Sequence, residues 1–135
     1  MAGIPERGGY CDFCLLLYPD RGKNVGMLVT TTENPAGYRT QKVLGQVFGV
    51  VVRSRSLVGN IGAAFKSLAG GEIKQYTRLV EDARRHAIDR MIENAALLGA
   101  NAVVMMRFDS SEIGQTMSEV AAYGTAVVLD PPPPA

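Results

Sequence analysis

An apolar stripe between residues 73 and 98 restricts the fold of this 135-residue chain more than any other feature. Its members recur every three or four positions over about seven helical turns: Ile73, Tyr76, Val80, Ala83, Ala87, Met91, Ala95 and Leu98. This spacing predicts a long amphipathic helix, and Gly99 suits a left-handed cap at its end. Because alanines keep the stripe narrow, we expect another element to pack closely against it.

Two apolar segments before this helix read as strands. Residues 27–32 form a β-branched run, and residues 40–53 alternate in a strand period with apolar side chains on both faces. We therefore expect the second strand to be covered on both sides. Its alternating glycines, among them Gly45 and Gly49, indicate a bulge or the close approach of another backbone.

The remaining elements complete an α+β pattern. Ser56 suits the N-cap of a short helix that ends before Gly70 and Gly71, while residues 101–108 and 117–129 read as buried strands after the long helix. The predicted order is strand-strand-helix-helix-strand-strand, which is one α+β domain.

Composition and charge exclude several classes of protein. Hydrophobic residues make up 47% of the chain and charged residues 20%, which fits a globular domain and not a disordered one. The net charge of +1 gives no overall attraction to nucleic acid or to an anionic membrane. No apolar run approaches the roughly 18 residues of a membrane-spanning helix, so we expect a cytoplasmic protein without nucleic-acid or membrane partners.

The two ends of the chain differ from its middle. Residues 1–26 hold both cysteines and lack the features of a signal peptide, so they read as an appended arm. Residues 130–135 are rich in proline and should leave the body as a stiff, extended tail.

Seven separated motifs resemble the YbjQ family over residues 27–129. They lie at residues 27–32, 52–55, 70–77, 98–104, 107–109, 119–120 and 122–127. Members of this family are described as candidate heavy-metal-binding domains that assemble as homopentamers with a dodecin-like β/α arrangement. The resemblance therefore implies a dodecin-like domain, a pentameric ring in which the chain is its own partner, and a metal ligand.

Cys11 and Cys14 are candidate metal ligands, although they lie outside residues 27–129, which carry the resemblance. Their Cys-x-x-Cys spacing supplies two thiolates, but a tetrahedral site needs two more ligands, and the chain has no second pair. His86 is distant in sequence and lies on the exposed flank of the long helix. Three readings stay open: two reduced thiols, a metal site shared between the arms of several subunits, and a redox dithiol.

A polar set is the second candidate site: Glu72, Tyr76, Arg107, Asp109, Glu119 and Tyr123, with Arg53 as a further member. Glu72 and Tyr76 are four residues apart and share a helix face, while Arg107 and Asp109 point to one side of their strand. The set reads either as a salt-bridge network or as a carboxylate-lined pocket for a cation or small polar ligand. Arg53 beside Ser54 and Arg55 also suits a phosphate site or a contact between subunits.

These patterns predict a non-enzymatic homo-oligomer that binds a divalent metal ion or small ligand at its subunit junctions. A structural ring that recruits other proteins through its arms is the alternative, and a hydrolase is the third reading. Nothing in the sequence sets a nucleophile, a base and a substrate in one geometry.

Overall fold

A computed structural model describes residues 26–54, 74–115 and 117–134 of the chain. In order, its elements are β1 (Leu28–Val29), β2 (Arg39–Ser54), α3 (Lys74–Leu97), β3 (Ala102–Ile113) and β4 (Met117–Asp130). This confirms the mixed α+β class, with one helix and four strands in the described part of the chain. The short helix predicted after Ser56 lies outside the described residues.

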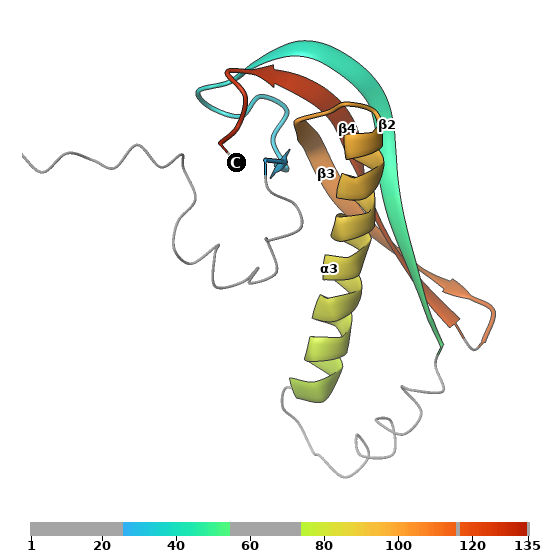
Figure 1. The fold of residues 1–135 in the computed structure, drawn as a ribbon. Coiled ribbons are helices and arrows are strands. Elements are labelled where there is room, and N and C mark those ends of the chain that lie inside the picture. Colours follow the sequence, from blue (N-terminus) through green and yellow to red (C-terminus); the bar gives the residue numbers. More distant parts are fainter. Residues whose placement is uncertain (1–25, 55–73, 116, 135) are drawn as a thin grey trace, which may run out of the picture.

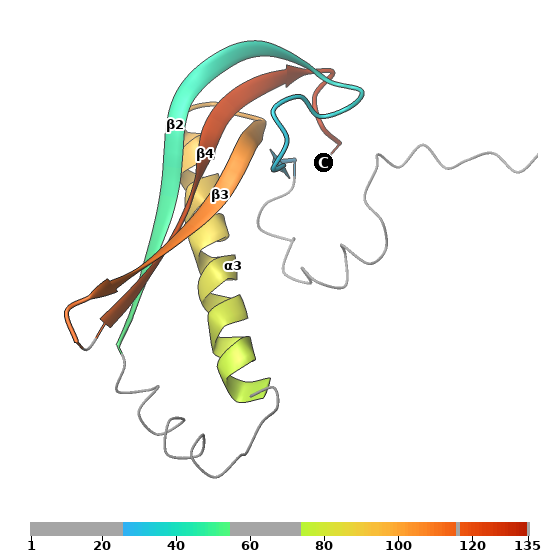
Figure 2. The same cartoon turned by 180° about the vertical axis from the view of Figure 1, so that it is seen from behind.

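The strands form one sheet in the order β1-β3-β4-β2, with β1 parallel to β3 and the other pairs antiparallel. Helix α3 crosses one face of this sheet and makes a second layer (Figure 1). The view from behind shows the opposite face of the sheet and the turn of the β3–β4 hairpin, which lies well away from the helix (Figure 2). The described fold is therefore a two-layer sandwich with a helix on one side only.

The helix and the sheet bury their apolar residues against each other, as the stripe predicts. The core between the layers includes Val47, Val51, Ala83, Ala87, Met91, Ala95, Val103, Ala122 and Ala126. Leu98 departs from the prediction and is 49% exposed. It follows the last helical residue, where Gly99 takes a φ of 84° and Ala100 N–H donates to the Ala95 carbonyl at 3.1 Å. The predicted left-handed cap is thus present, and it turns Leu98 away from the stripe.

Both predicted roles of the glycines in β2 are confirmed. A register shift occurs between Val43 and Gly45, where Gly45 has a φ of 127°. At Gly49, an added Cβ would overlap the Ala87 carbonyl oxygen and the Met91 amide nitrogen. The strand therefore packs directly against the helix backbone, which a narrow alanine stripe permits.

The expectation that β2 is covered on both sides is wrong for the described structure. Val47 and Val51 are buried beneath the helix, but Phe48 is 56% exposed and Val52 is 48% exposed on the opposite face. A sequence period shows that both faces are apolar, but it does not show whether the same chain covers them. Among the described residues, nothing covers Phe48 and Val52 on the second face of β2.

The segment before β2 covers one end of that second face. Leu28 and Tyr38 pack there against a small cluster of Ala102, Val104, Val127 and Leu129. Strand β1 is shorter than the predicted run of residues 27–32 because the chain turns after Thr30, whose hydroxyl donates to the Thr32 carbonyl at 3.1 Å. The predicted extended tail also differs, since Pro133 is buried.

Candidate functional site

Four of the predicted ligand residues lie together on the face of the sheet away from the helix. Arg107 pairs with Tyr123 across β3 and β4, and Glu119 pairs with Ser111, two positions beyond Asp109. Residues directly opposite each other in a sheet share a face, and so do residues two apart on one strand. Strand β2 adds Phe48 opposite Tyr123 and Val52 opposite Glu119. We call this surface the open face: Phe48, Val52, Arg107, Asp109, Glu119 and Tyr123.

A β-bulge in β3 places Arg107 and Asp109 on the open face. Val103 faces the helix, so simple alternation would also turn residues 107 and 109 toward the helix. The register shifts between Val104 and Arg107, and Met105 takes a φ of 55°. An extra residue of this kind reverses the alternation that follows it. The bulge thereby carries two charged residues out of the core.

Residues 30–32 hold the bulge in place. Met106 N–H donates to the Thr30 carbonyl at 2.9 Å, and Met105 N–H donates to the Thr32 carbonyl at 3.2 Å. The Arg107 guanidinium donates from Nη1 to the Thr31 carbonyl at 2.9 Å and to the Met106 carbonyl at 2.8 Å. Arg107 is therefore tied to the backbone of two segments.

The two carboxylates of the open face make only local hydrogen bonds. Asp109 Oδ1 accepts from the Ser110 N–H at 2.9 Å, and Glu119 Oε2 accepts from the Ser111 hydroxyl at 2.9 Å. Within the described residues, no ion pair joins either carboxylate to Arg107. Asp109 is exposed and Glu119 is partly buried. Both carboxylates therefore retain lone pairs that a ligand or another subunit can use.

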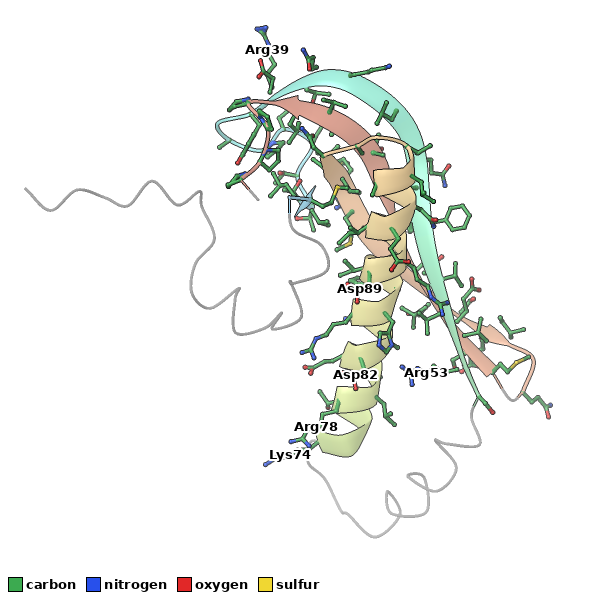
Figure 3. The ribbon with its side chains drawn as sticks, in the orientation of Figure 1. Arg39, Arg53, Lys74, Arg78, Asp82 and Asp89 are labelled. Carbon is green, nitrogen blue, oxygen red and sulfur yellow. The ribbon has the colours of Figure 1, made fainter. Side chains whose placement is uncertain are left out.

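Arg53 lies on the other face of the sheet and does not join this group. Its Nη2 lies 3.2 Å from Nδ1 of His86 on helix α3, and Figure 3 shows its side chain beside the helix. Arginine has no acceptor, so it donates and the His86 Nδ1 accepts. His86, on the flank of the long helix, is thus held by a side chain of β2.

The other candidates lie outside what the structure describes. Glu72, Cys11 and Cys14 are not among the described residues, and Tyr76 belongs to α3 (Lys74–Leu97) without a described side chain. The structure therefore brings together Arg107, Asp109, Glu119 and Tyr123 from the predicted set. It adds Phe48 and Val52, which the sequence analysis placed only in a covered strand.

The described residues do not fit a heavy-metal site within one chain. Across residues 26–54, 74–115 and 117–134, no three His, Cys, Asp or Glu side chains gather closely enough to hold an ion. Protein zinc sites use three or four such ligands. In His86, Nδ1 already accepts from Arg53. A metal bound by these described residues would need further ligands, from another part of the chain or from a second copy.

No helix in the described ranges is both long and apolar enough to cross a membrane.

Comparisons with known proteins identify relatives of the described domain. The family model YbjQ_1, described as "Putative heavy-metal-binding", matches residues 27–130. A UPF0145 protein from Bradyrhizobium sp. (strain ORS 278) is 64% identical over 105 residues, which cover 78% of this chain and 95% of that protein. A UPF0145 protein from Sulfurisphaera tokodaii is 55% identical over 103 residues, or 76% of this chain and 90% of the relative.

A solved structure supports the fold. A protein of the DUF74 family from Pediococcus pentosaceus, whose description gives its function as unknown, superposes with a TM-score of 0.53 at 20% identity. The match covers 78% of this chain and 99% of that chain. At this identity the likeness concerns the arrangement of helix and strands alone.

Proposed function

The chain belongs to the YbjQ family, and on that premise we propose that it is a non-enzymatic binding protein that assembles as a homopentamer. In this proposal the copies meet through the open face and bind a metal ion or small polar ligand at their junctions. The description of the family as metal-binding supports the choice of ligand. The absence of a metal-ligand cluster among the described residues of one chain supports its position between copies.

The exposed apolar side chains of the open face carry the proposal. Phe48 and Val52 are 56% and 48% exposed, and Met117 and Ile113 at the end of the hairpin are each 39% exposed. Contiguous apolar side chains beside charged ones are typical of surfaces that another protein covers. Packing a second copy here would remove these side chains from water.

The charged residues of the open face suit a ligand that is bound between copies. Asp109 and Glu119 offer carboxylate oxygens, which Zn²⁺ accepts as ligands, while Arg107 suits an anionic group on a small ligand. One chain supplies few donors, and a cation needs more. A junction that brings carboxylates from two copies together would complete the coordination and repay the cost of burying their charge.

Metal binding tests this proposal directly. We would purify the full chain without an affinity tag, measure its metal content, and follow its thermal unfolding while Zn²⁺ is added. Binding to the native state alone raises the unfolding temperature. Replacing both carboxylates, Asp109→Asn with Glu119→Gln, should abolish this rise because the oxygen donors lose their charge.

The matched control replaces two carboxylates outside the open face, Glu33→Gln with Glu93→Gln, which are both exposed. It should respond to Zn²⁺ as the unchanged protein does. An equal rise in all three proteins would remove the open face as the metal site. An assembled protein that never responds to metal would favour the alternative function, a ring that serves as a platform for other proteins.

A further inference from the structure

Strand β2 lies at one edge of the described sheet. The strand order β1-β3-β4-β2 leaves it with β4 as a neighbour on one side only. An edge strand of this length, Arg39–Ser54, presents backbone groups that can pair with a strand of another molecule. Proteins usually block such edges with side chains or with another element.

Two side chains of helix α3 reach the backbone of β2. Asn94 Nδ2 donates to the Phe48 carbonyl at 2.8 Å, and Arg90 Nη1 donates to the Val50 carbonyl at 2.5 Å. The donors are four residues apart on the helix, about 6 Å along its axis. The acceptors are two residues apart on the strand, about 6.6 Å along it. The two spacings match, so the contacts form a ladder between helix and strand.

The bonded carbonyls point away from β4. In a strand, the carbonyl and N–H of one residue lie at the same edge, and successive residues alternate between the two edges. Phe48 and Val50 are two apart, and donors from the helix reach both carbonyls. These are therefore the outward groups of the edge strand, and the amides of the same two residues point outward with them.

We propose that Arg90 and Asn94 guard the edge of β2 and prevent a strand of a second copy from pairing with it. A pairing strand would have to place its own N–H groups on the carbonyls of Phe48 and Val50. Arg90 and Asn94 already donate to these acceptors, so a pairing strand would have to displace both side chains. The edge has high β propensity, with Val47, Val50, Val51 and Val52 in sequence, so it needs such protection.

The Arg53 contact extends the same ladder by one helical turn. His86, Arg90 and Asn94 are spaced by four residues, and they contact Arg53, Val50 and Phe48 in reverse order along β2. The contact between His86 and Arg53 joins two side chains and does not involve a backbone carbonyl. Edge protection therefore rests on Arg90 and Asn94, while His86 helps to hold the strand along the helix.

The double variant Arg90→Ala with Asn94→Ala tests the proposal. We expect it to fold, because both carbonyls stay accessible to water after the donors are removed. Light scattering at increasing concentration should then show species heavier than the wild-type assembly. Hydrogen exchange should show the amides of Phe48 and Val50 protected by about tenfold or more in those species, since strand pairing bonds outward amides.

The exchange measurement separates edge pairing from other effects. Unfolding of the variant would speed the exchange of these two amides, and aggregation elsewhere would leave it unchanged. Arg78→Ala removes the same charge from an exposed position on the helix and should behave as the wild type. Arg90→Lys with Asn94 intact keeps a donor at each position and should restore the wild-type mass.

The proposal is overturned if the double variant keeps the wild-type mass distribution at all concentrations. It is also overturned if heavier species form without protection of the Phe48 and Val50 amides. If the double variant is unfolded, the single variants Arg90→Ala and Asn94→Ala replace it, and the proposal is overturned if neither forms heavier species with these amides protected. The proposed function is tested separately, because it depends on the side chains of the open face, whereas the edge proposal depends on the outward backbone groups of Phe48 and Val50.

Discussion

Single residues at two positions set how the layers and the open face are built. Gly49 leaves no room for a side chain between β2 and the helix backbone. Met105 takes a left-handed φ of 55° in the bulge that turns Arg107 outward. Gly49 is constrained by packing and Met105 by backbone geometry. Substitution at Gly49 should therefore lower the free energy of unfolding, and substitution of Met105 by glycine should raise it.

Gly49→Ala should lower the free energy of unfolding by about 3 kcal/mol, because the helix must move away from β2 to admit the methyl group. Chemical denaturation measures this change. Gly114→Ala is the control, since Gly114 has a φ of 63° and no atom within 4 Å of an added Cβ. It should cost only the backbone strain, about 1–2 kcal/mol. A loss at Gly49 no larger than that at Gly114 would contradict the close packing.

Met105→Gly should raise the free energy of unfolding by about 0.5–1 kcal/mol, because glycine adopts a positive φ without strain. Little packing is lost, since Met105 is 41% exposed. Met106→Gly should instead lower the free energy of unfolding, because Met106 packs against the core and has no positive φ that glycine would relieve. If Met105→Gly proved destabilising by more than this gain, the bulge would depend on the methionine side chain.

Among the elements, hydrophobic periodicity predicts well where the strands begin and end in the sequence, but it does not predict what covers their two faces. The predicted strands at 40–53 and 117–129 agree closely with β2 (Arg39–Ser54) and β4 (Met117–Asp130). Strand β3 runs on to Ile113, beyond the predicted end at 108, because its exposed hairpin end carries polar residues that weaken an apolar pattern. The alternation of side chains correctly predicted that Arg107 and Asp109 lie on the same side of their strand, but it could not show which side that is.

The parts that sequence reasoning missed depend on the backbone. No residue pattern marks the bulge at Met105, although the bulge decides which face Arg107 occupies. The contacts of Arg90 and Asn94 end on carbonyls, which are present at every position and leave no signal in a sequence. The exposure of the second face of β2 was not predicted either, since an apolar surface that stays open and one that is buried within the chain have the same composition in the sequence.

Helix α3 should depend on its buried stripe far more than on its exposed end. Met91→Ala should cost about 2–5 kcal/mol, because Met91 is 0% exposed and its loss leaves a cavity between helix and sheet. Leu97→Ala should change stability by less than about 0.5 kcal/mol, since Leu97 is 85% exposed. Thermal and denaturant unfolding of the two variants would test the ratio. Similar losses would mean that Leu97 is buried in the assembly.

In the whole molecule, the family match covers residues 27–130 and leaves the cysteine-bearing residues 1–26 outside it. The two described apolar clusters draw on the matched span, from Met27 and Leu28 to Leu129. On the ground of the family match, we propose that residues 1–26 are separable from the domain.

A chain that begins at Met27 should fold and assemble like the full chain, because both described clusters remain complete. Circular dichroism and light scattering on the two proteins would check this. Loss of assembly in the shorter chain would give residues 1–26 a structural role. If the full chain retains metal and the chain that begins at Met27 does not, the ligands are Cys11 and Cys14 and the open face does not bind the metal.

Light scattering on the full-length protein at micromolar concentration tests the central claim most directly, namely that the open face joins copies of the chain into a ring. We expect a single species with five times the mass of one chain. We also expect Phe48→Glu, which places a charge on the open face, to yield a folded protein of lower mass. A wild-type protein that is monodisperse and has the mass of one chain would show that the open face does not join copies of the chain.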